Sequence, residues 1–356
     1  VLPGQGEYFD PAMIEMGKPI NEAGYVTDII TEKSVRWLKE CDPNRPFFLM
    51  CHHKAPHREW EPSPVHRPSY KDQIQLPDTY DDDYKNRARA AAVAKMRIKS
   101  DLTYADLSKL KLIDKDTGEV FTFETERQLE EFKYQRYLQR YLSTIASIDD
   151  SVGKILDYLD ETDQAENTIV IYTSDQGFFL GEHGWFDKRF MYEQSFQMPF
   201  LVRYPKEIEA SSKCKNVCCN VDFAPTFLDF AEQKIPNYMQ GKSIRPLLAG
   251  TQPSEWMDVA YHRYWMHGDP DHNAYAHYGI RNERYKLIYW YNDGLELPGT
   301  SDEKDEPEWE LFDCQEDPLE LFNVYSDPAY AMVVQQMTDQ LNKKMKQIGD
   351  IPEHSM

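Results

Sequence analysis

The sequence has no apolar run long enough to cross a lipid bilayer. Its longest apolar segments, such as residues 46–51, are far shorter than the roughly 20 residues that a membrane helix needs. The mean hydropathy of −0.71 agrees with this observation. We therefore expect no membrane span.

Positive charge is scarce. The chain carries 40 basic and 61 acidic side chains, which gives a formal net charge of −21. A general nucleic-acid-binding protein needs a basic stripe that neutralises phosphates, so we expect no nucleic-acid partner. The same acidity repels anionic substrates unless a local positive centre overrides the global field.

Cysteine is also sparse, with six in 356 residues, so the sequence does not predict a disulfide framework. Cys214, Cys218 and Cys219 cluster, but their spacing is not that of a zinc site, and we expect thiols without a metal role. The first residues have neither the basic start nor the apolar segment of a signal peptide, and no initiator Met. We expect a processed or truncated chain.

What the sequence does contain is ample material for a core, since 41% of its residues are hydrophobic. Short apolar runs bounded by turn residues alternate with segments of helical periodicity, which predicts an α/β fold. We expect a large mixed, mostly parallel sheet sandwiched by helices. Strands are expected at residues 46–51, 168–173 and 200–204, and helices at 26–38, 81–99 and 129–159.

The character of the chain changes near residue 250. Residues 285–291 and 309–312 are typical of antiparallel strands, and residues 330–348 form an amphipathic closing helix. We therefore predict a sheet domain over residues 1–252 and a small C-terminal α+β subdomain with an antiparallel sheet over residues 253–356.

Two predicted strand exits are rich in polar side chains, and ligands of open α/β sheets bind where loops leave the strands. His52-His53-Lys54-Ala55-Pro56-His57 follows the first strand, and Ser174-Asp175-Gln176-Gly177 follows the second. Asp175 beside an amide suits a hard cation, although a turn aspartate that binds backbone N–H groups is the commoner case. Taken singly, a histidine or lysine here is more often structural or solvated than functional.

In combination these motifs resemble the type I sulfatase family of the alkaline phosphatase superfamily. The resemblance is carried by residues 171–184 followed by Lys188, by His53-Lys54-Ala55-Pro56-His57, and by Met239-Gln240-Gly241-Lys242-Ser243. It extends into the C-terminal segment through Gly279-Ile280-Arg281 and Glu310-Leu311-Phe312-Asp313. The chain looks most similar to bacterial glycan sulfatases such as N-acetylglucosamine-6-sulfatases.

The resemblance implies roles for particular residues. Asp175 and Gln176 match the family's Ca2+ ligands, Lys188 matches the lysine that contacts the sulfate, and His57 matches the histidine at the leaving-group oxygen. Calcium and an ammonium group neutralise charge on the sulfuryl oxygens, and an imidazole protonates the departing sugar oxygen.

Three further residues have alternatives. Lys54 is either a substrate contact or a solvated loop lysine, and His277 is a candidate to line the substrate pocket from the C-terminal subdomain. His183 lies in a Gly-flanked turn, and a structural role is favoured.

The family's nucleophile is a formylglycine made from the Cys of a C-x-P/A-x-R signature at the start of a helix. Cys41-Asp42-Pro43-Asn44-Arg45 fits the minimal pattern, but a predicted strand follows at once, so we interpret it as a chance match. Asp81-Asp82-Asp83 mimics the family's aspartate pair, but it is better explained as an acidic cluster at a helix N-terminus. We expect the resemblance to begin after the nucleophile segment.

The resulting hypothesis is a sulfuric-ester hydrolase acting on a sulfated carbohydrate, in a periplasmic or otherwise extracytoplasmic setting. Two alternatives are a phosphodiesterase or phosphonate hydrolase of the same superfamily, and a non-catalytic protein that binds sulfated glycans. The oligomeric state is not predicted. Within a chain of net charge −21, calcium, His57 and Lys188 would supply the compact positive centre that an anionic substrate needs.

Overall fold

The computed structural model describes residues 4–102, 111–113 and 118–354, and for 111–113 only the backbone. The chain divides into two compact units. The first unit comprises Val1–Leu76 and Ile98–Thr168, and the second comprises Pro77–Arg97 and Ile169–Met356. The domain boundary expected after residue 252 stays a prediction.

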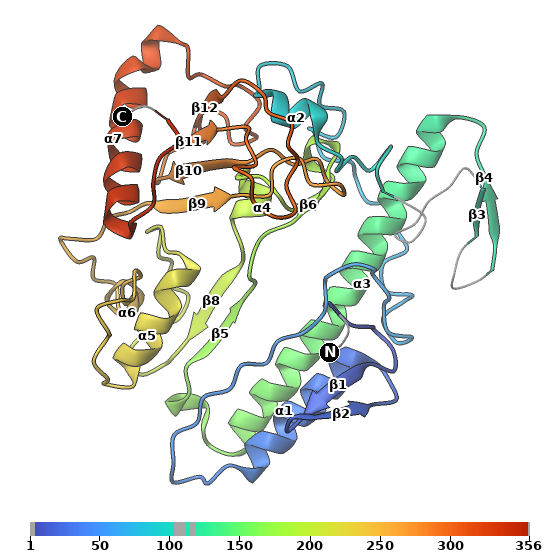
Figure 1. The fold of residues 1–356 in the computed structure, drawn as a ribbon. Coiled ribbons are helices and arrows are strands. Elements are labelled where there is room, and N and C mark those ends of the chain that lie inside the picture. The colour runs from blue at the N-terminus through green and yellow to red at the C-terminus, as the bar shows by residue number, and fades with distance from the viewer. Residues whose placement is uncertain (1–3, 103–110, 114–117, 355–356) are drawn as a thin grey trace. The chain divides into compact units, whose positions relative to one another are not determined.

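Two helices that pack against each other dominate the first unit (Figure 1). They are α1 (Val26–Glu40) and the long α3 (Glu126–Glu161), and both confirm helices predicted from the sequence. The hydroxyl of Thr31 in α1 donates to that of Ser151 in α3 over 2.7 Å. Two hairpins complete this unit, β1 (Ala12–Glu15) with β2 (Lys18–Asn21) and β3 (Lys111–Ile113) with β4 (Val120–Thr122).

Helix α3 starts at a capping box. The Thr125 hydroxyl accepts from the backbone N–H of Gln128, and the Gln128 side chain accepts in return from the backbone of Thr125. This exchange satisfies two of the N–H groups that a helix start leaves without partners. Tyr137 and Ile148 are among the residues of its buried face. The helix therefore forms where local capping and a 3.6-residue apolar period agree.

Two predictions about the first hundred residues are wrong. Within the described chain, residues 46–51 form no strand, and Phe48 and Met50 are 60% and 63% exposed. The helix expected over residues 81–99 shrinks to α2 (Arg89–Val93). Tyr84 and Asn86 have φ values of 57° and 59°, in the left-handed region that a helix cannot accommodate.

The sheet of the C-terminal region confirms the antiparallel prediction. Its four strands lie in the order β12-β11-β10-β9, and α7 contacts β10 and β11. The strands are β9 (Ala260–Tyr264), β10 (His277–Arg281), β11 (Tyr285–Trp290) and β12 (Glu308–Asp313), and the closing helix is α7 (Ala331–Ile348). Tyr278, Leu287 and Leu341 lie in the core between sheet and helix.

The remaining strands of the second unit include the two predicted near residues 168–173 and 200–204. Their positions are confirmed, but they do not pair in parallel as expected. β5 (Val170–Thr173) pairs with β8 (Phe200–Arg203) in an antiparallel ladder, and β6 (Phe179–Leu180) pairs with β7 (Phe186–Asp187). All strand pairs of the described residues are antiparallel. Parallel neighbours need a long crossover connection, whereas the segment between β5 and β8 holds only the β6–β7 hairpin and the short α4 (Glu193–Phe196).

Two short helices, α5 (Phe223–Phe230) and α6 (Arg245–Leu248), follow β8. Over the described ranges, the helices are too short or too polar to cross a membrane.

Candidate functional site

The six residues that sequence analysis singles out fall in both units. Lys54 and His57 belong to the first unit, whereas Asp175, Gln176, Lys188 and His277 belong to the second. The geometry around each group is therefore described within its own unit.

His57 lies in an irregular loop that backbone contacts hold in place. Its N–H donates to the carbonyl of Lys54 over 2.9 Å, and the Tyr8 hydroxyl donates to its carbonyl over 2.6 Å. The ring Nδ1 lies 2.7 Å from the carbonyl of Arg58. A carbonyl oxygen only accepts, so Nδ1 carries a hydrogen and Nε2 is the nitrogen that gains or loses a proton. The loop thus fixes the His57 ring through Nδ1, and its role in proton transfer stays a prediction.

Lys54 is buried rather than solvated, since its exposed fraction is 8%. Its ammonium group donates to the carbonyl of Arg58 over 3.1 Å and lies 4.6 Å from the ring centre of Tyr8. Burial lowers the pKa of Lys54, an effect that Glu7 and other acidic side chains oppose. The ammonium therefore stabilises the loop that carries His57, and its contact with substrate stays a prediction.

Asp175 and Gln176 lie in the loop that leaves β5. Asp175 is exposed, and its carboxylate accepts from the Ser174 hydroxyl over 3.3 Å. Within the described part of the chain, no cationic side chain pairs with this carboxylate. A carboxylate without a cationic partner, followed in the sequence by an amide side chain, offers the oxygen ligands that a hard cation takes, so these residue types fit a calcium ion.

Gly177 fixes the position of this loop. Its N–H donates to the carbonyl of Ser195 over 2.9 Å, and the next residue donates to that of Gln194 over 2.7 Å. A Cβ at Gly177 would lie 2.2 Å from the Gln194 carbonyl oxygen. Only glycine permits this approach, and the approach holds the Asp175 carboxylate at the strand exit.

Lys188 follows the β6–β7 hairpin and is 8% exposed. Its ammonium group lies 5.3 Å from the ring centre of Phe178 and 3.7 Å from a carboxylate oxygen of Asp187. The same Asp187 oxygen accepts the backbone N–H of Lys188 over 2.7 Å. Sequence analysis missed Asp187, although its position beside Lys188 was a signal that could have found it.

His277 is fully buried at the start of β10. The centre of its ring lies 4.3 Å from the ring centre of Trp290 and 5.6 Å from that of Tyr264. Its Nδ1 donates to the carbonyl of Tyr275 over 2.8 Å. Burial lowers the pKa of His277 to about 3, so the ring is neutral at pH 7. Its predicted place in a substrate pocket stays a prediction.

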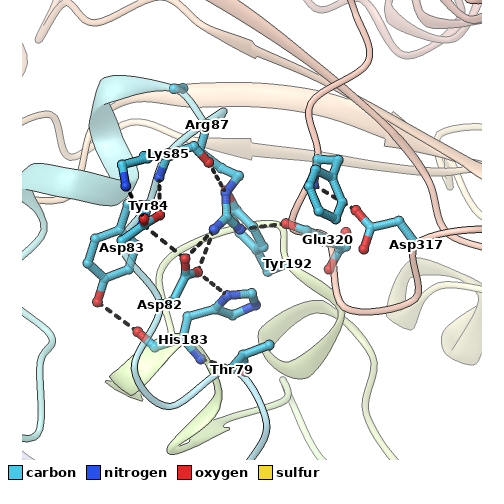
Figure 2. A network of polar contacts seen from close by, with 12 residues as sticks. Thr79, Asp82, Asp83, Tyr84, Lys85, Arg87, His183, Tyr192, Asp317 and Glu320 are labelled. Carbon is cyan, nitrogen blue, oxygen red and sulfur yellow. Dashed lines mark hydrogen bonds and ion pairs between the residues drawn. The ribbon is translucent and has the colours of Figure 1, made fainter.

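A buried ion network in the second unit was not foreseen from the sequence (Figure 2). Asp82 forms two contacts of 2.5 Å with Arg87 and lies 2.9 Å from His183 Nδ1. Burial alone would raise the pKa of Asp82, but hydrogen bonds from His183 and Tyr84, together with Arg87, lower it to about 2. The sequence analysis placed Asp81-Asp82-Asp83 at a helix N-terminus. This prediction is wrong, because α2 begins only at Arg89.

The same network holds the turn between β6 and β7. The backbone N–H of His183 donates to the Thr79 hydroxyl over 3.0 Å, and the Tyr84 hydroxyl donates to the His183 carbonyl over 2.7 Å. His183 thus has the structural role that its Gly-flanked turn indicates. Its partners were not predictable, because the Asp82 contact spans 101 residues of sequence.

Arg87 extends the network toward the four-stranded sheet. It donates to the Glu320 carbonyl over 2.6 Å (Figure 2). The Glu320 side chain in turn pairs with Lys286 over 2.5 Å. Lys286 also pairs with Glu193 over 2.8 Å. Buried charges are tolerated when each has such partners.

The chance nucleophile motif lies at the wrong end of a helix. Cys41 is the C-terminal cap of α1, and the Arg45 N–H donates to the Asp42 carbonyl in the turn that follows. A helix C-terminus disfavours negative charge, whereas the family's nucleophile needs a helix start.

Comparison with protein families gives two matches. A model described as sulfatase matches residues 4–233, and a model described as N-sulphoglucosamine sulphohydrolase, C-terminal, matches residues 181–347. A curated relative, the N-acetylglucosamine-6-O-sulfatase of Bacteroides thetaiotaomicron, is 38% identical over 380 residues. That alignment covers 97% of this chain and 66% of the relative. The Clostridium perfringens arylsulfatase is 27% identical, with 54% of its length covered. The chain thus spans about two thirds or less of the curated relatives it matches.

Solved structures give the same result. One similar structure is that of BT4656 in complex with its substrate D-glucosamine-2-N,6-O-disulfate, whose sequence is 39% identical. The TM-score is 0.86, and the match covers 97% of this chain and 74% of that one. The phosphonate monoester hydrolase of Agrobacterium radiobacter has a TM-score of 0.68 at 22% identity, over 92% of this chain and 62% of that one. The second similarity shows the fold alone, and together they confirm the α/β class with its C-terminal subdomain.

Proposed function

Because the chain belongs to the sulfatase family of the alkaline phosphatase superfamily, we propose that it serves the hydrolysis of a sulfate ester on a sulfated sugar. The observation that carries this proposal is the 38% identity to an N-acetylglucosamine-6-O-sulfatase over 97% of the chain. The similarity to a structure that holds a glucosamine disulfate supports the same substrate class. The proposed substrate is therefore a glucosamine-type residue that carries a 6-O-sulfate.

Lys188 is the proposed sulfate-binding cation. Its side chain is largely buried, so water screens the lysine charge less than at an exposed site, and this charge acts more strongly on a neighbouring sulfate oxygen. Charge accumulates on the leaving-group side and the sulfuryl oxygens as the S–O bond breaks, and a preorganised cation stabilises it. The cation also offsets the repulsion between an acidic protein and an anionic substrate.

His57 is the proposed general acid. Its Nδ1 is occupied by the Arg58 carbonyl, so the proton it transfers to the departing sugar oxygen resides on Nε2. Lys54 maintains this geometry because it donates to the same carbonyl oxygen. Lys54 and His277 are the proposed substrate contacts outside the reacting centre.

The family is generally metal-dependent, and Asp175 with Gln176 are the proposed ligands that this chain supplies. Their oxygens favour calcium over a soft metal. When bound, the ion supplies positive charge that polarises the sulfate ester. The family's formylglycine nucleophile and an extracytoplasmic location belong to the same proposal.

The test compares substrates. The full-length gene product is assayed with N-acetylglucosamine-6-sulfate, a phosphodiester and a phosphonate monoester, with calcium present. We expect inorganic sulfate as product and a much higher kcat/KM for the sulfate ester. A preference for the phosphonate would favour the phosphonate hydrolase alternative. Calcium-dependent binding of the sulfated sugar without turnover would identify a glycan-binding protein instead.

A further inference from the structure

Lys188 lies within a cluster of charged side chains drawn from two segments of the second unit. Residues around the end of β7 supply Asp187 and Arg189, and the loop between β9 and β10 supplies Asp269 and His272. Asp187, Asp269 and His272 are only 1%, 4% and 6% exposed. Three titratable groups this deeply buried beside the proposed sulfate-binding lysine require an explanation.

Asp187 is the hub of this cluster. One carboxylate oxygen accepts the Lys188 N–H and lies 3.7 Å from both the Lys188 ammonium and the Arg189 guanidinium. The Asp187 backbone has a φ of 73°, in the left-handed region that is unfavourable for a non-glycine residue. Such a conformation persists only when surrounding contacts enforce it. The orientation of Lys188 therefore depends on what holds Asp187.

His272 holds the other oxygen of Asp187. Its Nε2 lies 3.2 Å from that oxygen, and its Nδ1 lies 2.8 Å from Asp269. Asp269 is itself fixed, because it accepts the backbone N–H groups of His272 and Ala274 over 2.9 and 3.2 Å. The Lys95 N–H donates to the His272 carbonyl over 2.6 Å. The imidazole is thus anchored on one side and presents Nε2 to Asp187 on the other.

Two hydrogen-bonding states are available at Nε2. Arg189 Nη2 lies 3.1 Å from it, and a guanidinium nitrogen only donates. When the imidazole is protonated, Nε2–H donates to Asp187. When it is neutral, with its hydrogen retained on Nδ1 toward Asp269, Nε2 has a lone pair that accepts from Arg189 instead. The proton on His272 therefore decides which neighbour the ring binds.

The charges facing His272 favour the protonated state. Burial lowers the pKa of His272, but the hydrogen bonds to Asp187 and Asp269 outweigh it and raise the pKa above its usual value, with Arg189 opposing. Burial raises the pKa of Tyr264, so this neighbour on β9 is neutral. Among the described residues, the titratable and charged groups of this cluster include Asp187, Lys188, Arg189, Tyr264, Asp269 and Asp271.

We infer that His272 is a positioning residue for Lys188. The protonated ring clamps Asp187, and Asp187 fixes the backbone and ammonium group of Lys188. Loss of the proton releases Asp187 and transfers the ring to Arg189. This inference rests on the proposed function only for its consequence, which is that affinity for a sulfate ester falls as pH rises through the His272 pKa.

The first test needs no activity. The chain is labelled with ¹⁵N-lysine, the Lys188 amide signal is assigned by its loss in Lys188→Arg, and its shift is followed with pH. We expect the amide to titrate with the same midpoint as the His272 ring and to stop titrating in His272→Gln. A Lys188 amide that stays constant while His272 titrates would overturn the inference.

The second test distinguishes the hydrogen bonds made by the two ring nitrogens of His272. A glutamine places its amide nitrogen near the position of Nε2, whereas an asparagine places it near Nδ1. His272→Asn should raise KM for the sulfate ester by about 10-fold, on the scale of residues that orient a site through another residue. His272→Gln should retain a KM near that of the wild type at neutral pH but lose the alkaline rise in KM.

His267 provides a matched control on the same loop. It is 2% exposed and accepts the Ala276 N–H over 3.2 Å, so His267→Asn disturbs the loop without touching Asp187. We expect its KM and pH profile to match the wild type. Equal effects of His267→Asn and His272→Asn would contradict a positioning role. If the wild type releases no sulfate, the proposed function fails, whereas the amide titration still decides the inference.

Discussion

Asp82 carries more of the stability of the second unit than its surface neighbours. Its side chain is 5% exposed and pairs with Arg87, which is 1% exposed, and with the fully buried His183. Asp82→Asn leaves the Arg87 charge buried and poorly compensated, a loss that typically costs about 3–5 kcal/mol. We expect a decrease of that size in the free energy of unfolding, measured by urea titration.

Asp83 is the matched control for this change. It pairs with Lys85, but the two side chains are 58% and 79% exposed, so water compensates for the loss of the ion pair. Asp83→Asn should unfold at the same urea concentration as the wild type. An Asp82→Asn protein as stable as Asp83→Asn would show that the buried network is not needed for folding.

We expect Glu310 to lower the stability of the folded protein as the pH rises, whereas a carboxyl group with a lowered pKa does the reverse. Its side chain is fully buried on β12 and accepts from the Ala88 N–H and the Trp290 indole over 2.6 and 2.8 Å. Burial raises the pKa of Glu310 to about 7, although these hydrogen bonds lower it in part. In the unfolded chain a glutamate titrates near 4.3. The folded protein therefore holds an extra proton between these values, and this stabilisation is lost as pH rises through about 7.

Glu310→Gln removes that titration while it keeps the shape of the protonated acid. Between about pH 5 and about pH 8, the wild type should lose up to about 3 kcal/mol more unfolding free energy than the variant. Denaturant titrations at both pH values measure the difference. Glu308→Gln, two residues away on the same strand, is the control and should keep the wild-type slope. Equal slopes in all three proteins would refute the assignment to Glu310.

At the scale of elements, the loop after β5 depends on one glycine. Gly177→Ala places a methyl group 2.2 Å from the Gln194 carbonyl oxygen and 2.8 Å from that of Gln197, and both are backbone atoms. The loop must therefore move, together with the Asp175 carboxylate. We expect a lower thermal midpoint and weaker calcium binding by isothermal titration calorimetry.

Gly153 in α3 is the opposite case. A Cβ there meets nothing within 4 Å, so Gly153→Ala should stabilise the helix by about 1 kcal/mol. Its calcium binding should equal that of the wild type. Unchanged calcium binding in Gly177→Ala would show that this loop does not hold the ion.

Sequence reasoning succeeded where structure is set locally. The periodicities of α1, α3 and α7 lie within one segment each, and the sequence shows them directly. It failed for residues 46–51, because a strand exists only when another segment pairs with it. It failed over 81–99 because contacts of Asp82 and Tyr84 with the distant His183 turn the chain away from a helix.

At the scale of the whole molecule, motifs predicted the family, and contacts between distant segments remained invisible. Gly177 and Lys188 lie in one ordered motif, so the sequence pointed to them. The side chains that support Lys188 through Asp187 include His272 and Asp269. The contact between His272 and Asp187 joins positions 85 residues apart in the sequence. No local pattern links such positions, which is why the clamp on Asp187 emerged only from the structure.

The net negative charge of the chain affects the proposed substrate binding at the scale of the whole molecule. A net charge of −21 would slow the approach of the proposed anionic sugar, so its binding would depend on a concentrated positive site. Lys188 and Arg189 lie next to each other in the sequence, and Asp187 of the buried cluster pairs with both. Lys188 is therefore the proposed site of sulfate recognition.

The measurement that tests this claim most directly is the release of inorganic sulfate from N-acetylglucosamine-6-sulfate by the full-length gene product and its Lys188→Met variant. Methionine keeps the apolar stem and removes the charge, and Lys304→Met, at a 61% exposed lysine, is the control. We expect sulfate release by the wild type and the control, and a kcat/KM lower by about 10²–10³-fold in Lys188→Met. Wild-type turnover in Lys188→Met would contradict this claim.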